Sequence, residues 1–310
     1  MGTASARSSA ISLRLPNRRS VCRNLLGYVF IGPWLLGFLV FFLGPMVASA
    51  VLAFMKYDIL TPPVFIGLMN FERMIGDDLF YTALYNTAYY TFLAVPLQVI
   101  LALLLALALN IKVRGMNIFR TAFYLPAITP AVASVILWVW IYNPDYGLAN
   151  AVLRFFGLQP VGWLWHPQWS KPSLVIMSLW SIGTQMVVFL AGLQSVPEVL
   201  MEAAAIDGAG RLRRFWNVTV PMVSPIIFFN LVVGIINSFQ VFTAAFIATG
   251  GGPRDTTLFY VLFLYQHGFQ NFRMGYASSL AWFLFVIILG FTILQFWLAR
   301  RWVYYEGPRV

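Results

Sequence analysis

Charged side chains are scarce in this sequence of 310 residues: they make up 10% of it, whereas apolar residues make up 60%. A soluble domain carries about 25% charged residues, so the composition favours a membrane protein. A charge at the centre of a spanning helix costs about 2.5–3.5 kcal/mol, and the charges are segregated accordingly. All 30 Asp, Glu, Lys and Arg residues lie outside six long stretches, namely 26–55, 79–111, 121–144, 172–197, 215–253 and 274–299.

Residues that bind metals, form disulfides or hold nucleotides are also few. Cys22 is the one cysteine, which excludes an internal disulfide, and His166 and His267 are far apart in the sequence. No GxxxxGK[ST], HExxH or CxxC motif occurs, so the chain has no P-loop ATPase site of its own. We therefore predict that the chain has no metal site.

Each charge-free stretch can supply the roughly 20 residues that a spanning helix needs. The predicted fold class is an all-α membrane protein with about six transmembrane helices, in a domain at 26–303 between tails at 1–25 and 304–310. A further stretch, 155–170, is too short and too rich in Pro and Trp to span, so we expect it at the interface. Turn signals place the six helices near 27–54, 84–110, 119–142, 173–195, 222–248 and 276–299.

The distribution of Lys and Arg predicts the orientation of these helices. Positive residues concentrate on the cytoplasmic side, so both termini are expected to be cytoplasmic. This topology and contact with anionic lipid account for the net charge of +10, so no nucleic-acid partner is expected. If the helices alternate in direction, 14 of the 20 Lys and Arg residues share the side of the N-terminus: Arg7, Arg14, Arg18, Arg19, Arg23, Lys112, Arg114, Arg120, Arg211, Arg213, Arg214, Arg300, Arg301 and Arg309.

The most hydrophilic stretch in the middle of the chain is EAAAIDGAGRLRRFWNVTVPMVSP, at 202–225. Its beginning, 202–206, favours a helix, and the Asp207-Gly208 pair offers a turn in which glycine tolerates left-handed backbone angles. The arginine-rich part can form a second short helix, and Pro221 is tolerated in the first turn of the next membrane helix. These residues fit either a helix-turn-helix elbow or an amphipathic connector whose arginines bind lipid phosphates.

The spacing of this stretch is Glu-Ala-Ala, two residues, Asp-Gly-Ala, five residues, Phe, two residues, an aliphatic, one residue, an aliphatic, and Pro. It resembles the EAA loop of the inner-membrane permease subunits of ATP-binding-cassette (ABC) importers, in the sugar and glycerol-phosphate class. The segments 65–91, 249–257 (TGGGPRDTT) and 265–278 are also similar to this family, and the Gly-Gly-Gly-Pro stretch is typical of the maltose-type first permease. The resemblance excludes 1–25 and departs at Met201, where relatives often have Tyr.

This resemblance implies a type I ABC importer permease fold and a division of labour. A second homologous permease would complete the pathway as a heterodimer, and two ABC ATPase subunits would bind ATP and Mg²⁺. This chain would then not be an enzyme and would have no catalytic residue and no bound cofactor. An extracytoplasmic solute-binding protein would deliver a sugar, oligosaccharide or glycerol-phosphate-like solute. The chain would lie in a bacterial or archaeal plasma (inner) membrane as a multi-pass protein, in contact with membrane lipids.

The resemblance also implies that the cytoplasmic loop at 196–221 docks into a cleft on the ATPase. Closure of the ATPase dimer would then pull on helices four and five and drive alternating access. Glu202 would pair or cap at the cleft, and Gly208 would make the turn. The coupling residues implied in this way are Glu202, Ala203, Ala204, Asp207, Gly208, Ala209, Phe215 and Pro221.

A sugar-like solute needs hydrogen-bonding groups and aromatic faces midway through the membrane. In helix five, Asn230, Gly234, Asn237 and Ser238 recur at three or four residues and so share one helix face. Such a face can serve as a binding site or as polar contact between helices, worth about 0.6 kcal/mol per hydrogen bond. The candidate pathway residues are Trp180, Ser181 and Gln185 in helix four, and Gly234, Asn237, Ser238 and Gln240 in helix five.

Two other functions can be compared with this interpretation. An ion-coupled carrier normally needs ionisable groups inside the membrane, and the predicted spans have none. A polytopic membrane enzyme acting on lipid-linked substrates, the alternative function, needs a carboxylate or histidine cluster near the interface. Of the four carboxylates predicted on the cytoplasmic side, three lie in or beside the 202–225 stretch. This distribution favours the permease over the membrane enzyme.

Overall fold

The computed structural model describes residues 29–111 and 113–304. The chain divides into two compact units, Met1–Val51 and Leu52–Val310. The first unit contains a candidate membrane span that runs in sequence from Val29 to Leu52, with a π-helical turn, η1 (Leu39–Leu43), followed by α2 (Gly44–Leu52). The first helix predicted from the sequence, 27–54, includes this span. Its residues 27 and 28 lie outside the described residues.

In the second unit, three helices are long and apolar enough to span a membrane by themselves: α4 (Asp78–Leu109), the continuous segment Arg211–Phe239 that includes α12 (Val220–Phe239), and α15 (Met274–Trp302). Two bent helix pairs can form further spans. These pairs are α5 (Met116–Ile128) with α6 (Ala131–Ile141), and α8 (Pro167–Ser178) with the 3-10 turn η2 (Leu179–Ser181) and α9 (Gly183–Gln194). The predicted all-α membrane fold class is confirmed.

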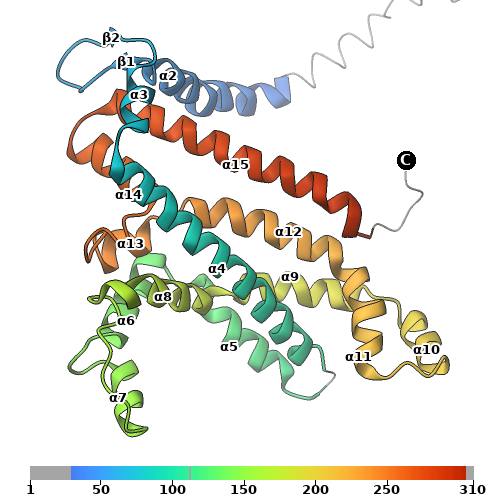
Figure 1. The fold of residues 1–310 in the computed structure, drawn as a ribbon. Helices are drawn as coiled ribbons and strands as arrows, with labels where there is room; N and C mark the ends of the chain where they lie inside the picture. The colour runs from blue at the N-terminus through green and yellow to red at the C-terminus, as the bar shows by residue number, and fades with distance from the viewer. Residues whose placement is uncertain (1–28, 112, 305–310) are drawn as a thin grey trace, which may run out of the picture. The chain divides into compact units, whose positions relative to one another are not determined.

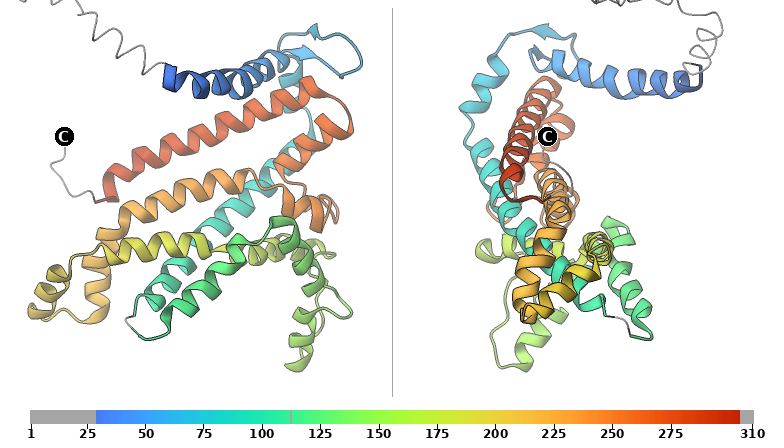
Figure 2. Two further views of the ribbon diagram at one scale, coloured as in Figure 1. Left: turned by 180° about the vertical axis from the view of Figure 1, so that it is seen from behind. Right: turned by 90° about the vertical axis from the view of Figure 1, so that its right-hand side faces the viewer.

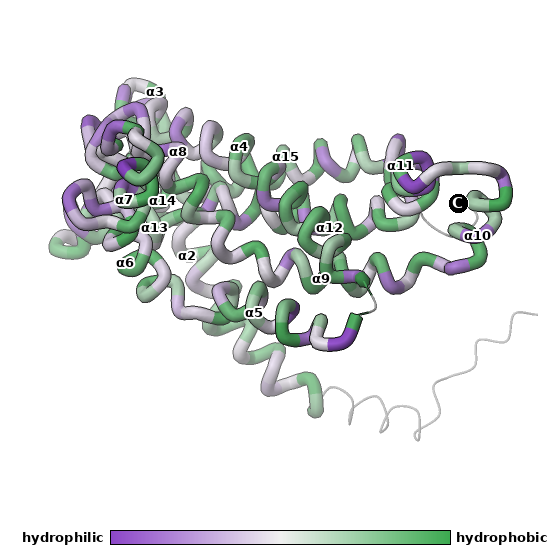
Figure 3. The backbone as a smooth tube through the Cα atoms, turned by 90° about the horizontal axis from the view of Figure 1, so that it is seen from below, coloured by the Kyte–Doolittle hydropathy of each residue, from purple (hydrophilic) through white to green (hydrophobic). Residues whose placement is uncertain are grey.

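The short elements of the second unit gather at two opposite ends (Figures 1 and 2). α10 (Glu198–Ile206) and α11 (Arg211–Arg214) lie at one end, which we call the α10 end. Figure 3 shows hydrophilic segments at both ends and mainly hydrophobic helices between them, as expected for a membrane protein. The opposite end, called the α3 end, holds α3 (Met69–Ile75), α7 (Leu148–Phe155), α13 (Thr243–Ala248), α14 (Tyr260–Tyr265), the π-helical η4 (Gln266–Gln270) and a hairpin of β1 (Met55–Lys56) and β2 (Val64–Phe65).

The long helices pack around α4, which contacts both α9 and α12, while α15 packs against α12. Small residues of α4, including Ala94, Ala102 and Ala106, are fully buried and let the neighbouring backbones approach closely. Gly192 in α9 serves the same purpose, because a Cβ there would overlap the Ile226 side chain of α12. Close packing of these three helices forms one hydrophobic cluster of the unit, and a larger cluster includes Phe80 of α4, Tyr260 of α14 and Leu280 of α15.

Two of the predicted helices are broken in the structure. The stretch expected to form one helix, 119–142, is divided by a 98° bend between α5 and α6, because Pro130 lacks an N–H group and holds Thr129 in an extended conformation. The helix expected at 173–195 begins earlier, at Pro167, and bends by 49° between its two parts. Proline at the first helical position explains the early start, since its missing N–H would be unpaired there anyway.

The helix expected at 222–248 also differs at both ends. α12 ends at Phe239, and the residues beyond it form the separate helix α13. At its other end, α12 is continuous with α11 through a π-helical turn, η3 (Phe215–Thr219). The helical rod Arg211–Phe239 therefore extends from the α10 end through the span.

Candidate functional site

α10 and α11 form an elbow with a tight turn between them at the α10 end (Figure 1). Gly208 has a φ of +77°, a left-handed conformation that strains residues with a Cβ. The Ala209 N–H donates to the Ala204 carbonyl over 2.9 Å, and the Gly208 N–H donates to the Ala205 carbonyl over 3.0 Å. These two bonds form a Schellman motif, which sets the direction in which the chain leaves α10.

The elbow has no buried side chain in α10 or α11. A helix with no buried face gains little from tertiary packing, so its free surface is available to a partner. The coupling residues expected from the sequence lie along the elbow and its continuation: Glu202, Ala203, Asp207 and Gly208 are exposed, and Ala204, Ala209, Phe215 and Pro221 are partly buried.

Apolar side chains on the elbow are more exposed than the sequence analysis anticipated. Ile206 is 87% exposed, and Val199 and Leu212 are both 72% exposed. Exposed aliphatic residues close together mark interaction surfaces. Ile206 and Leu212 lie within the hydrophilic stretch at 202–225, at positions that the EAA pattern leaves unspecified.

The second arm of the elbow is part of the spanning helix rather than a separate segment. The Val220 N–H donates to the Phe215 carbonyl, which is the five-residue step of a π-helix. This turn precedes Pro221, which has no backbone N–H group to donate to the preceding turn. Pro221 lies in the first turn of α12, as expected from the sequence, but α12 is continuous with α11. The resulting rod can transmit a displacement of the elbow directly to α12.

The three elbow arginines do not share one environment. Arg211 and Arg213 are exposed, whereas Arg214 is partly buried, and its Nε atom has no hydrogen-bond partner among the described residues. The exposed pair suits contact with lipid phosphates or with a partner protein.

The candidate pathway residues of helix four lie at the bend of that span. Trp180 and Ser181 belong to η2 and are exposed, and Trp180 makes an edge-to-face contact with Trp138 of α6, with ring centroids 5.9 Å apart. Gln185 follows in α9, and its buried Oε1 atom accepts no hydrogen bond from any described residue. The bend thus carries an aromatic contact, and α9, which follows it, carries an unpaired amide oxygen.

The candidate pathway residues of helix five point in two directions. Gly234 packs against α4, because a Cβ there would lie 2.9 Å from Val95 Cγ1, and the Ser238 hydroxyl donates to Thr91 Oγ1 over 3.0 Å. Both are buried, whereas Asn237 and Gln240 are exposed. The single polar face expected from the spacing is therefore divided between contact with α4 and an open side.

A polar cluster at the α3 end was missed in the sequence analysis. Asn86, which is 2% exposed, donates from Nδ2 to the carbonyls of Asp255 (2.7 Å) and Leu258 (3.1 Å) and accepts from Lys171 Nζ (3.0 Å). We call these residues, together with Ser170 and Thr256, whose hydroxyls lie 2.8 Å apart, the Asn86 network. No sequence signal linked the three segments that contain these residues, because the segments are distant along the chain.

Lys171 of this network has no carboxylate partner among the described residues. Its Nζ atom lies over the rings of Tyr85 and Tyr89, at 4.8 and 5.0 Å from the centroids. Cation–π contacts of this kind stabilise a partly desolvated charge. In the part of the chain that the structure describes, no three His, Cys, Asp or Glu side chains come together as a metal site.

Comparison with known proteins identifies the family. Residues 80–304 match the family described as binding-protein-dependent transport system inner membrane component. The chain belongs to this family. It is a permease subunit of an ABC importer and not an enzyme, since ATP hydrolysis in these systems is carried out by separate subunits. The alternative of a polytopic membrane enzyme receives no support.

Individual relatives match the permease over nearly its whole length. The probable ABC transporter permease protein YesP of Bacillus subtilis (strain 168) is 44% identical over 289 residues, which cover 92% of this chain and 93% of YesP. The arabinooligosaccharides transport system permease protein AraP of the same organism is 34% identical over 273 residues, or 86% of each chain.

A solved structure also resembles the permease. One chain in the crystal structure of a bacterial alginate ABC transporter, in complex with an alginate pentasaccharide-bound periplasmic protein, superimposes with a TM-score of 0.80 at 26% sequence identity. The match covers 91% of the permease and 96% of that chain. The expected type I ABC importer fold is confirmed by this similarity.

Proposed function

We propose that the permease carries a sugar or oligosaccharide, or a glycerol-phosphate-like solute, across a bacterial or archaeal plasma membrane. It does so as one half of a heterodimer with a second homologous permease, together with two ATPase subunits and an extracytoplasmic solute-binding protein. The names of AraP and of the alginate transporter support the carbohydrate class. The excess of Lys and Arg on one side supports cytoplasmic termini and puts the α10 end in the cytoplasm.

The observation that carries this proposal is the helical rod Arg211–Phe239, with its exposed elbow. An ATPase that holds the elbow can move α12 as a nearly rigid body, because no flexible loop intervenes between α11 and the span. α12 packs against both α4 and α9. A displacement of the rod therefore moves Asn237, which is part of the rod, and reaches Gln185 on the neighbouring helix α9.

The coupling role is tested by Gly208→Asp and Glu202→Lys in the complete transporter. Asp at position 208 is strained by the left-handed backbone, and Lys at position 202 reverses the charge offered to the ATPase. We expect both variants to reach the membrane but to lose copurification with the ATPase and transport-stimulated ATP hydrolysis. Gly210→Asp is the matched control, because Gly210 has a φ of −65° and caps α11, where Asp is favoured. Normal copurification and hydrolysis in both test variants would contradict the docking role.

Within the span, we propose that Trp180, Ser181, Gln185, Asn237 and Gln240 line the solute path. Gly234 and Ser238 support the path from behind by holding α12 against α4. Trp180 offers an aromatic face and Gln185 an unpaired oxygen, which together suit a ring that carries hydroxyl groups.

Gln185→Leu and Asn237→Leu test this assignment. Each removes polar groups without adding volume to the packed face, so uptake should fall while assembly and basal ATP hydrolysis stay normal. Ser238→Ala is the control for the packing side, where the loss of one interhelical hydrogen bond costs only about 0.6 kcal/mol. Unchanged uptake in both leucine variants would move the solute path elsewhere.

A further inference from the structure

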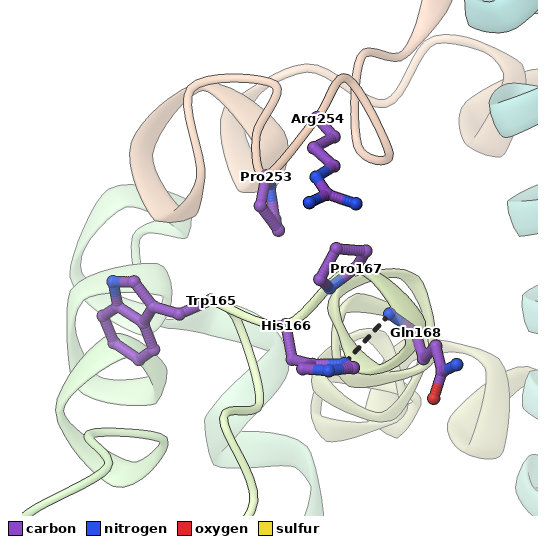
Figure 4. Close-up of a pocket in the computed structure, with 6 residues that line it drawn as sticks. All are labelled: Trp165, His166, Pro167, Gln168, Pro253 and Arg254. Atoms are coloured by element: carbon purple, nitrogen blue, oxygen red, sulfur yellow. Dashed lines mark hydrogen bonds between the residues drawn. The ribbon is translucent and has the colours of Figure 1, made fainter.

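An open pocket lies at the α3 end, between the start of α8 and the loop that follows α13. It is lined by Trp165, His166, Pro167, Gln168, Pro253 and Arg254. Figure 4 shows the Arg254 side chain extending from the loop toward Pro167 at the start of α8. The Arg254 guanidinium is thus the charged group that reaches into this space, while the Trp165 indole and the Gln168 amide point away from it, and a guanidinium suits a carboxylate.

The loop that carries Arg254 is held in place from two helices. Asn86 of α4 binds the Asp255 carbonyl, and Ser170 of α8 contacts the Thr256 hydroxyl, both in the Asn86 network. Within the loop, the Thr256 hydroxyl donates to the Pro253 carbonyl over 2.7 Å. The residues on either side of Arg254 are therefore fixed, although its own side chain is not.

The backbone at this point adopts a conformation that is unfavourable for residues with a Cβ. Arg254 has a φ of +51° and Asp255 a φ of +58°. Such residues persist only where the surrounding structure holds them. Here the Asn86 network supplies that support.

The Arg254 charge is free for a partner. The side chain is exposed and makes no hydrogen bond or ion pair with any residue in the described ranges 29–111 and 113–304. By contrast, Arg154 at the same end donates to the carbonyls of Pro144 and Asp145. Arg254 thus combines a fixed backbone with an unused guanidinium, which can bind a carboxylate through two parallel hydrogen bonds.

We propose that this pocket binds a carboxylate side chain of the solute-binding protein, with Arg254 as its ion-pair partner. The proposal rests on the proposed function, which puts the α3 end outside the membrane. Three points favour a protein carboxylate over a carboxylate of the solute. The pocket is open, its cation is exposed, and it lies at the end of the unit rather than beside Gln185 and Asn237 in the span.

The test uses the complete transporter in lipid vesicles, titrated with its purified solute-binding protein. In Arg254→Gln, the concentration of binding protein that half-saturates stimulated ATP hydrolysis should rise about ten- to a hundredfold, the range for loss of a charge-assisted hydrogen bond. The maximal rate should stay unchanged. Arg254→Lys should have an intermediate effect, since lysine keeps the charge but loses the planar fork. Arg273→Gln, another exposed arginine at the same end, is the control and should match the wild type.

Three outcomes would overturn the proposal. The first is an unchanged half-saturating concentration in Arg254→Gln. The second is a lower maximal rate without a change in half-saturation. The third is a defect seen with uronate oligosaccharides but not with neutral ones, which would assign the pocket to the solute. A wild-type transporter that no solute-loaded binding protein stimulates would instead overturn the proposed function itself, and the pocket assignment with it.

Discussion

The two ends of the permease hold their polar groups in opposite ways. At the α3 end, Asn86 is buried and fully engaged, and its network joins α4 and α8 to the loop at 249–258. At the α10 end, the elbow has no buried side chain, and its apolar residues, including Ile206, are exposed. The first arrangement is satisfied within the subunit, whereas the second leaves an open surface that, in the proposed function, the ATPase covers. Substitutions in the Asn86 network should therefore change stability, and substitutions of the exposed apolar residues of the elbow should change coupling.

The largest effect on stability is expected from Asn86→Leu. The leucine would remove the Asn86 partner of the buried Leu258 carbonyl and of the Lys171 ammonium group, whereas the Asp255 carbonyl keeps its bond from the Leu258 N–H. A buried polar group left unpaired costs about 1–3 kcal/mol. The thermal unfolding midpoint of the subunit in lipid nanodiscs should fall by several degrees. Asn271→Leu, at an exposed position of the same end, should leave the midpoint unchanged. Equal midpoints for Asn86→Leu and the wild type would show that the network is not a source of stability.

The converse is expected from Ile206→Asp at the elbow. An apolar side chain buried in an interface contributes about 1.5–3 kcal/mol, so association with the ATPase should weaken about tenfold or more. The unfolding midpoint of the isolated permease should not change, because Ile206 contacts little of its own chain. The measurement is the ATPase concentration needed for half-maximal assembly. Ile111→Asp, exposed between α4 and α5 at the same end, is the control, and an equal loss in both variants would point to a general charge effect instead.

A smaller effect should appear in the pH dependence of stability. Burial lowers the pKa of His267, and Arg273 and Arg73 lower it further against the opposing effect of Asp77. The unfolded state, with a pKa of about 6.5, then binds more protons than the folded state just below that pH. Stability should be complete above pH 6.5 and decrease as the pH falls toward the lowered pKa of the folded state.

His267→Asn should flatten this pH dependence. The ring packs edge-on against Phe263 and Tyr276, with centroids at 4.5 and 4.9 Å, so the variant also loses some stability at every pH. Unfolding midpoints from pH 5 to 8 separate the two effects, because only the titration changes the slope. His166→Asn is the control at an exposed position. A slope that persists in His267→Asn would assign the pH dependence to another group.

The sequence predicted what local patterns encode. The charge-free stretches gave the spans and the fold class, and the Asp207-Gly208 pair predicted the turn that the structure shows at Gly208. Pro130 is a helix breaker, but the apolar residues on both sides of it were predicted as one helix from their hydrophobicity alone.

Other features depend on contacts between distant parts of the chain. The spacing of Gly234, Asn237 and Ser238 predicted a shared face, but only the position of Val95 and Thr91 on α4 divides that face into a packed side and an open side. The Asn86 network could not be predicted for the same reason, because its members are joined only in the folded structure. The roles of the elbow and of the open side of α12 stay predictions until they are tested.

The most direct test of the account is photo-cross-linking from both ends of the permease in the assembled transporter. A photoreactive residue at position 206 should form adducts with the ATPase and none with the solute-binding protein. The same residue at position 254 should give the reverse pattern. Adducts between position 206 and the solute-binding protein, or no ATPase adduct from position 206 in a transporter that hydrolyses ATP normally, would contradict the assignment of the elbow as the coupling element.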